Sequence, residues 1–239
     1  MRDFFLDNYS FFTKVVEIIP ALVGLFVFKK FKAYKIKYLI YFLFFVLFVE
    51  FVSMYPQLIY DGHLKTLGNL VKGTVFQRNY WWYTIMWNSI GGLFYSLYFS
   101  WQLNNTTFKS ILKWLQLIFV VTTVVDLSLN WQDLFNQGSD YAIFFSAILI
   151  IISVVFYFIE ILTNEKLISF HKSINFYIAC ILLIWFVITT PLKFYNGYYR
   201  VSDWDYIFLQ YAIYFIANFM MYIGYALLLI LCKPQPHDA

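Results

Sequence analysis

Charged residues are scarce in this chain of 239 residues. They make up 13% of the sequence, whereas 62% of the residues are hydrophobic and 24% are aromatic. A soluble domain of similar length is about a quarter charged and about half apolar. Uncharged apolar stretches long enough to cross a bilayer recur along the chain. The composition therefore excludes an ordinary soluble domain and predicts an all-α polytopic membrane protein.

Cysteine and histidine are also rare. Cys180 and Cys232 both fall inside apolar runs, so we expect neither a disulfide framework nor a metal cluster. The histidines His63, His171 and His237 lie at or beyond the ends of the apolar runs. This placement excludes haem held by facing histidines and a membrane-embedded Ser–His protease.

Other signatures of catalysis are missing as well. Asp126 is the single aspartate that we place inside an apolar run, whereas an intramembrane aspartyl protease needs two. The last run has no lysine for a retinal Schiff base, and the chain has no Gly-rich phosphate loop, CxxC or HExxH. We expect a non-enzymatic protein without a cofactor or metal. The net charge of +4 resides in loops and indicates topology rather than nucleic-acid binding.

Seven apolar runs have about the 20 residues that a helix needs to cross the hydrocarbon layer. They cover residues 11–28, 38–59, 80–101, 110–130, 141–162, 173–194 and 204–231. We expect helices, because the runs lack the alternation of apolar and polar residues that is typical of barrel strands. No basic segment precedes the first run and no small-residue cleavage site follows it, so we expect a retained helix. The sequence predicts one membrane domain, residues 1–239, built as a seven-transmembrane-helix bundle.

The lysines predict the orientation of this bundle. The loop "KKFKAYKIK" carries five lysines in nine residues, and such a loop stays in the cytoplasm. The loop "NWQDLFNQGSD" has no Lys or Arg, as an outer loop may. Further inner loops carry Lys109, Lys113, Lys166 and Lys172. We expect the N-terminus outside and the C-terminus inside, in the cytoplasmic (inner) membrane of a bacterium.

Aromatic residues and one long loop mark the predicted outer face. The aromatic belt comprises Tyr80, Trp81, Trp82, Tyr83, Trp131, Tyr198, Tyr199 and Trp204. The loop "YDGHLKTLGNLVKGTVFQRN" has about 20 residues and three basic side chains. We interpret it as a loop with an interfacial helical turn, which either forms a lid or lies on the headgroups.

Two stretches of the chain are alike, "FVSMYPQLIYDG" at 51–62 and "FVITTPLKFYNG" at 186–197. Aligning them places Pro56 on Pro191 and Lys37 on Lys172, and both stretches predict proline-broken outer ends of outward-running helices. A 3+1+3 parallel repeat follows, as in SWEET carriers. The Pro56-Gln57 pair superficially resembles the SWEET and PQ-loop families, although the run 141–162 lacks the proline that those families place there.

The chain also resembles uncharacterised seven-helix membrane proteins of Bacteroidota. The resemblance rests on the start "FFLDNYSFFTKVVEIIPALVGLFVFKKFK" and on the segment "NYWWYTIMW". It covers nearly the whole chain and implies the fold and an envelope location, but no activity.

Carboxylates within a bilayer are costly and usually face a partner or water. From the rise of about 1.5 Å per residue, we place Glu17, Glu50 and Asp126 in the outer half of their runs. Glu160 lies near an inner end, beside Lys166, and we expect its side chain to extend toward the interface.

Other polar residues fall in or near the same outer layer, namely Asn88, Thr190 and Gln210. Together with the three outer carboxylates they predict an outward-facing polar cavity that admits a small ligand or cation. The alternative is pairing within the bundle, of Glu17 with Lys14 and of Asp126 with neighbouring Thr122 or Thr123.

Three functions fit these observations. The leading hypothesis is a sensor or accessory subunit that acts through a protein partner or oligomer in the lipid bilayer. A transporter of a small solute or cation is the second hypothesis, motivated by the repeat and the carboxylate layer. The third is a structural subunit of an envelope complex, in which the carboxylates bind partner helices.

Overall fold

The computed structural model describes residues 2–163, 173–195 and 204–233. Within these ranges every regular element is a helix, which confirms the all-α class. The predicted inner-loop residues Lys166, His171 and Lys172 and the predicted belt residues Tyr198 and Tyr199 lie outside the described ranges.

Six of the described helices are long and apolar enough to cross a membrane, in agreement with a multi-pass membrane protein. They are Arg2–Phe31, Ile36–Tyr60, Thr106–Leu129, Asp140–Thr163, Ile174–Leu192 and Trp204–Leu231. The predicted run 80–101 is helical but is divided into three consecutive elements. These are α5 (Tyr80–Trp82), the π-helix η2 (Tyr83–Gly91) and α6 (Gly92–Gln102). The seventh span therefore stays a prediction.

The chain forms two compact units. Unit 1 contains residues 1–44 and 165–239, and unit 2 contains residues 45–164. Helix α2 (Ile36–Ser53) contributes its first half to unit 1 and its second half to unit 2. The units differ from the halves of the predicted repeat, because unit 1 combines both ends of the chain. The repeat stays a prediction.

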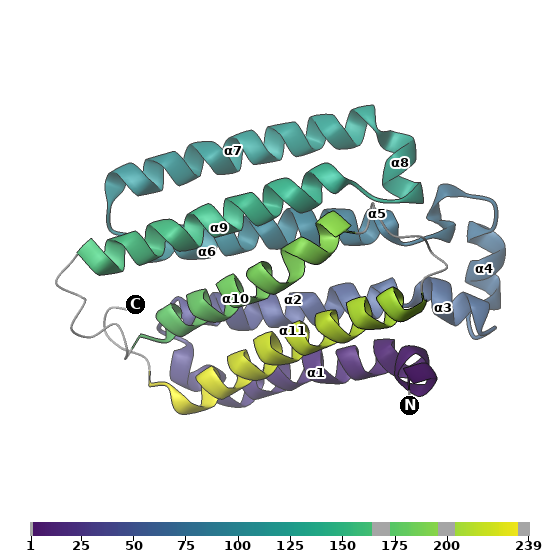
Figure 1. The fold of residues 1–239 in the computed structure, drawn as a ribbon, viewed down its shortest axis with the longest axis horizontal. Coiled ribbons are helices and arrows are strands. Elements are labelled where there is room, and N and C mark those ends of the chain that lie inside the picture. Colours follow the sequence, from purple (N-terminus) through teal and green to yellow (C-terminus); the bar gives the residue numbers. More distant parts are fainter. Residues whose placement is uncertain (1, 164–172, 196–203, 234–239) are drawn as a thin grey trace. The chain divides into compact units, whose positions relative to one another are not determined.

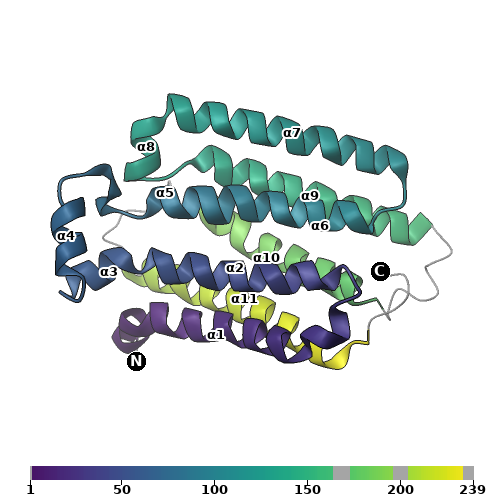
Figure 2. The ribbon, with the colours of Figure 1, turned by 180° about the vertical axis from the view of Figure 1, so that it is seen from behind.

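Unit 1 is built around the pair of α1 (Arg2–Phe31) and α11 (Trp204–Leu231), which lie side by side in both ribbon views (Figures 1 and 2). Helix α10 (Ile174–Tyr195) packs against α11. Arg2 forms an ion pair with Asp205 at one end of the α1–α11 pair. At the other end, Lys30 Nζ donates to the carbonyl of Leu229 at 3.1 Å.

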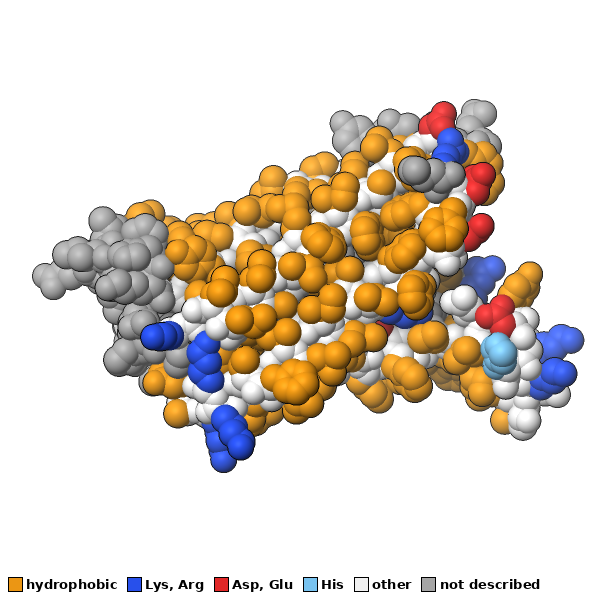
Figure 3. All heavy atoms as spheres, turned by 90° about the horizontal axis from the view of Figure 1, so that it is seen from below, with side chains coloured by type: hydrophobic (Ala, Val, Ile, Leu, Met, Phe, Trp, Pro, Cys, Tyr) orange, Lys and Arg blue, Asp and Glu red, His pale blue; other side chains and the backbone are white. Residues whose placement is uncertain are grey.

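The outer surface of α1 and α11 is apolar. Phe26 and Leu231 are 84% and 72% exposed. Figure 3 shows hydrophobic side chains over the middle of this face and charged side chains toward its ends. In water such a surface would be unfavourable, whereas lipid chains cover it without cost.

Unit 2 holds the remaining elements. After α2 come α3 (Tyr55–Tyr60), α4 (Lys65–Val71), the short 3-10 helix η1 (Val75–Gln77) and the segment α5–η2–α6. They are followed by α7 (Thr106–Leu129), α8 (Trp131–Asn136) and α9 (Asp140–Thr163). Helices α6, α7 and α9 pack on one another. Helix α4 confirms the helical turn that was predicted for the loop between the second and third apolar runs.

Small and polar residues hold α6, α7 and α9 together. Gly92 lies so close to α9 that a Cβ atom there would be 2.5 Å from Ser146 Cβ. About one turn after Gly92 in α6, Ser96 Oγ accepts from two buried side chains. Ser153 Oγ of α9 donates to it at 2.8 Å, and Gln116 Nε2 of α7 donates to it at 3.0 Å. Close backbones and interhelical hydrogen bonds are the usual means of helix association in lipid.

Glu160 is buried within the protein, so the prediction of a side chain that extends to a solvated interface is wrong. Its side chain is 5% exposed and accepts three hydrogen bonds from the α6–α7 connection. The donors are Asn104 N at 2.7 Å, Asn104 Nδ2 at 3.0 Å and Asn105 N at 3.0 Å. Asn105 Oδ1 in turn caps α7 by accepting from Thr107 N and Phe108 N. The turn needs acceptors for its N–H groups, and three charge-assisted bonds offset the burial of the carboxylate.

The two similar stretches fold differently. Helix α2 ends at Ser53, and Pro56 lies in the first turn of α3, where a missing N–H costs little. Pro191, in contrast, lies inside α10, which continues to Tyr195. The expectation of a proline-broken helix is confirmed for Pro56 and is wrong for Pro191. A proline inside a membrane helix is tolerated where neighbouring groups satisfy the freed carbonyl.

Candidate functional site

The end of α2 is bound by side chains from the start of the next predicted run. Asn79 Nδ2 donates to the Ser53 carbonyl at 2.7 Å, and Trp82 Nε1 donates to the Val49 carbonyl at 2.9 Å. Ser53 is the last residue of α2, so its carbonyl has no partner within the helix, and Val49 lies one turn earlier. Trp82 is 8% exposed, so the prediction that it belongs to an interfacial belt is wrong.

Glu50 is bonded at the same junction. The Tyr83 hydroxyl donates to Glu50 Oε2 at 2.9 Å and lies 2.8 Å from Ser53 Oγ. Ser53 Oγ donates to the Glu50 carbonyl at 2.7 Å. The carboxylate is half-buried, whereas Ser53 is buried. A bond between a phenol and a carboxylate is charge-assisted, and it stabilises Glu50 in a run that is otherwise apolar.

Tyr83 is also the first residue of the π-helix η2, which continues for nine residues to Gly91. π-Helical geometry is rare, is mostly confined to single turns, and is frequent at functional sites. Ser89 Oγ donates to the Thr84 carbonyl at 2.8 Å inside this segment. The predicted site residue Asn88 lies in η2 and is half-buried. The residues that bind the end of α2 are Glu50, Ser53, Asn79, Trp82 and Tyr83, and we call this set the α2–η2 junction. Its last member, Tyr83, begins the helix that contains Asn88.

Asp126 has a different role in unit 2. It accepts from Asn130 Nδ2 at 2.7 Å and from Ser139 Oγ at 2.6 Å. Thr122, proposed as an alternative partner, donates instead to a carbonyl of its own helix at 2.7 Å. Asp126 therefore connects the end of α7 to the residue before α9, and its bonds do not extend to Glu50.

The other three predicted site residues belong to unit 1. Glu17 is 5% exposed and lies near enough to the Tyr9 phenol to interact with it electrostatically. The Tyr9 ring meets the Tyr211 ring edge-on with centroids 4.6 Å apart, and Thr13 lies one turn after Tyr9 in α1. Since residues 9, 13 and 17 share one helix face, α1 turns a polar strip toward α11.

Gln210 and Thr190 complete the predicted set. The Gln210 side chain lies near the phenol of Tyr214, one turn later in α11. Thr190 is half-buried in α10, beside the fully buried Thr189. Lys14, the alternative partner of Glu17, donates to Ser10 Oγ at 2.9 Å.

Sequence reasoning missed the tyrosines that bind Glu50 and approach Glu17. Tyr83 was interpreted as an interfacial aromatic residue, and Tyr9 was not considered. A signal was available, because Asn79, Trp82 and Tyr83 follow the i, i+3, i+4 spacing of one helix face. Polar aromatic residues on the face that meets a carboxylate-bearing helix are candidates for donors rather than belt residues.

The described residues contain no group of three or more His, Cys, Asp or Glu side chains that could hold a metal ion. Comparisons with family models, with curated proteins and with solved structures each find no match. The function is therefore argued from the residues of the chain itself.

Proposed function

We propose that this chain is a seven-span protein of the bacterial cytoplasmic membrane that acts as a sensor or accessory subunit through a membrane partner. The observation that carries the proposal is the bond between Glu50 and Tyr83, the first residue of the nine-residue π-helix. It joins a carboxylate in an apolar run to a segment of rare geometry.

The seventh span is the segment of α5, η2 and α6. These elements follow one another without a gap from Tyr80 to Gln102, which is enough residues to cross the hydrocarbon layer. The lysine-rich loop at 29–37 supports an outside N-terminus and an inside C-terminus. With this orientation the α2–η2 junction lies toward the outer side of the membrane.

The junction supplies the input of the sensor. A cation or hydrogen-bond donor that reaches Glu50 from outside competes with the single proton of the Tyr83 hydroxyl. Once Tyr83 is released, η2 loses a contact that holds its first turn, and the segment relaxes toward α-helical geometry. An α-helical turn contains fewer residues than a π-helical turn, so this relaxation rotates the following helix about its axis.

The output passes through unit 2. A rotation of α6 changes the face that it presents to α9, where Gly92 meets Ser146 and Ser96 bonds Ser153. Closely packed interfaces of this kind have discrete arrangements rather than continuous ones. The membrane partner then binds the rearranged surface of unit 2.

The test is a pull-down of the tagged full-length protein from its host in a gentle detergent, read by mass spectrometry. We expect a stoichiometric membrane partner with the wild type and an at least fivefold change in its capture with Glu50→Gln. Asp126→Asn, also a carboxyl-to-amide change in an outer half, is the matched control and should leave capture unchanged. A reproducibly partnerless wild-type protein would contradict a sensor or accessory role.

A transporter is the second candidate. It is favoured by the presence of two glutamates in the outer halves of their helices, Glu17 and Glu50, each close to a tyrosine hydroxyl. Substrate-dependent flux in proteoliposomes, reduced by Glu50→Gln, would support transport. Partner capture that is stoichiometric and equal in wild type and Glu50→Gln would instead favour a structural subunit.

A further inference from the structure

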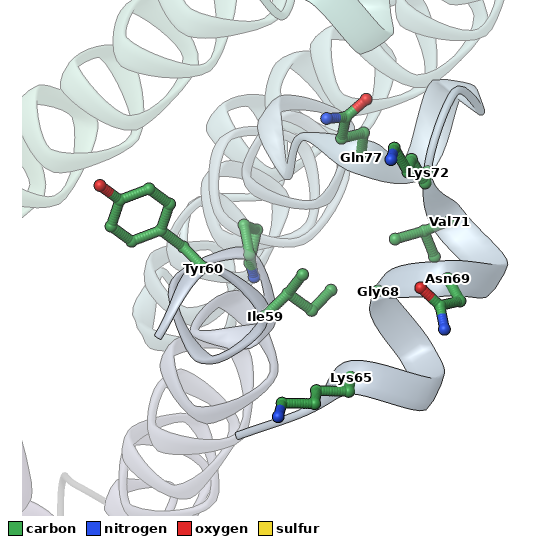
Figure 4. Close-up of a pocket in the computed structure, with 9 residues that line it drawn as sticks. Ile59, Tyr60, Lys65, Gly68, Asn69, Val71, Lys72 and Gln77 are labelled. Carbon is green, nitrogen blue, oxygen red and sulfur yellow. The ribbon is translucent and has the colours of Figure 1, made fainter. Parts of the chain in front are cut away.

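The connection from α3 to η1 folds around a pocket of about 500 Å³. This volume is in the range of small-molecule sites rather than of a single bound ion. Its lining includes four polar side chains, Lys65, Asn69, Lys72 and Gln77, and an apolar part to which Ile59 and Val71 contribute. Figure 4 shows Ile59 facing the α4 turn that carries Gly68, with Lys65 at one end of the pocket and Lys72 beside Gln77 at the other.

Lysine and amide groups share one face of α4. Lys65 and Asn69 lie one turn apart on α4, which brings their side chains to the same side of the helix, and Lys72 is the residue that follows α4. In the part of the chain that the structure describes, neither ammonium group forms an ion pair and none of the four polar side chains forms a hydrogen bond. Their hydrogen-bonding capacity is therefore available to a ligand.

The walls of the pocket are fixed by contacts outside it. The Tyr55 hydroxyl donates to the Phe76 carbonyl at 2.6 Å and so holds η1 to α3. Helices α3 and α4 touch where a Cβ at Gly68 would lie 2.8 Å from Ile59 Cγ2. Gly62 and Gly73 have φ of +79° and +74° in the turns on either side of α4, a conformation that side-chain-bearing residues rarely adopt.

We infer that this pocket binds the phosphate group of an anionic phosphate ester. Two ammonium groups provide the charge, and no carboxylate is among the lining residues. Lysine recognises phosphate as a point charge, and the amides of Asn69 and Gln77 can donate to the remaining oxygens. The apolar part accommodates the carbon skeleton of the ligand. The inference does not depend on Glu50 or on the proposed sensor role.

A phosphate of this kind can come from a lipid headgroup or from a soluble phosphate ester. Helix α4 also exposes apolar side chains, of which Leu70 is 71% exposed, and such amphipathic helices lie at membrane surfaces. The experiment therefore uses one probe for each source. The probes are short-chain phosphatidylglycerol and glycerol 3-phosphate, and short-chain phosphatidylcholine is the zwitterionic comparison.

Binding is measured by equilibrium retention of radiolabelled probe on the full-length protein in a neutral detergent. We expect the wild type to bind at least one anionic probe. The double variant Lys65→Gln/Lys72→Gln should bind this probe with an affinity that is lower by about tenfold or more. The matched control is Lys29→Gln/Lys32→Gln, which removes the same charge from exposed positions elsewhere and should bind like the wild type.

Each outcome is decisive. Binding of phosphatidylglycerol alone supports the pocket and assigns the lipid source, whereas binding of glycerol 3-phosphate assigns the soluble source. Absence of binding of both anionic probes to the wild type, or an equal loss in the two double variants, would overturn the inference. Equal affinity for phosphatidylcholine and phosphatidylglycerol would also overturn it.

Discussion

Glu160 and Glu50 are both carboxylates near the ends of apolar helices in unit 2, but their surroundings differ. Glu160 is buried and accepts three N–H bonds from the connection between α6 and α7. Glu50 is half-buried, and its carboxylate accepts a hydrogen bond from the phenol of Tyr83. The donors of Glu160 are mainly backbone groups that cannot leave, whereas the donor of Glu50 is a side chain that can rotate.

This difference separates a structural carboxylate from a responsive one. Two backbone donors make Glu160 part of the fold, because its loss would leave the N–H groups of Asn104 and Asn105 without their acceptor. A side-chain donor that can rotate away can be replaced by a ligand at little cost to the fold. We therefore expect changes at Glu160 to affect stability and changes at Glu50 to affect signalling.

The largest effect is expected for Glu160→Ala. Removing the acceptor of three hydrogen bonds should lower the free energy of unfolding by about 3–5 kcal/mol. Denaturant titration in detergent micelles measures this free energy. The free energy of unfolding of Glu160→Gln should lie between those of Glu160→Ala and the wild type, because glutamine keeps one acceptor oxygen. A loss below about 1 kcal/mol would mean that Glu160 is not a structural residue.

Gly92→Ala should have the next largest effect. The added Cβ would lie 2.5 Å from Ser146 Cβ, so α6 and α9 must separate. We expect a cost of about 1–3 kcal/mol in the free energy of unfolding. The second change Ser146→Gly removes the opposing Cβ and should recover much of this cost, which a double-mutant cycle measures. If Gly92→Ala costs the same free energy in the wild type and in Ser146→Gly, then α6 and α9 do not approach each other closely at Gly92 and Ser146.

A smaller effect is expected at the Glu50–Tyr83 bond. Tyr83→Phe and Glu50→Gln should each cost about 1 kcal/mol, and the two changes together should cost less than their sum because they remove the same bond. The coupling energy from a double-mutant cycle in unfolding experiments gives the strength of this bond. Strict additivity would argue that the two side chains act independently.

The smallest effect is expected for Ser139→Ala. It removes one of the two donors to Asp126, while Asn130 remains, so we expect about 0.5–1 kcal/mol. Thermal unfolding followed by circular dichroism measures it, with the exposed Ser128→Ala as a comparison that should have almost no effect. If Ser139→Ala lowers the stability more than Tyr83→Phe does, the bonds of Asp126 contribute more to stability than the bond of Glu50, which contradicts the expected order.

The apolar runs predicted the helices well, because in lipid a backbone can satisfy its polar groups only within the helix. The run at 80–101 shows the limit of this reasoning, since hydropathy carries no signal for the π-helical geometry of Tyr83–Gly91. The broken and unbroken helices at Pro56 and Pro191 were also indistinguishable, because the difference depends on what surrounds each proline.

For the site, the sequence identified carboxylates that require a partner but not the partner itself. Glu17 and Glu50 were named because a charge in an apolar run is costly. Tyr9 and Tyr83 were missed, since pairing between helices depends on which faces meet. Three of the six predicted site residues lie in unit 1 and three in unit 2, and a single sequence does not indicate how the chain divides into units.

Hydrogen exchange of the segment 83–91, followed by mass spectrometry on the full-length protein in lipid nanodiscs, tests the central claim most directly. It compares the wild type with Glu50→Gln, Tyr83→Phe and the control Asp126→Asn. The account predicts that exchange in 83–91 accelerates in Glu50→Gln and Tyr83→Phe, while the connection held by Glu160 at 103–105 is unchanged. Unchanged exchange in 83–91, or the same acceleration in Asp126→Asn, would contradict control of the π-helix by the Glu50–Tyr83 bond.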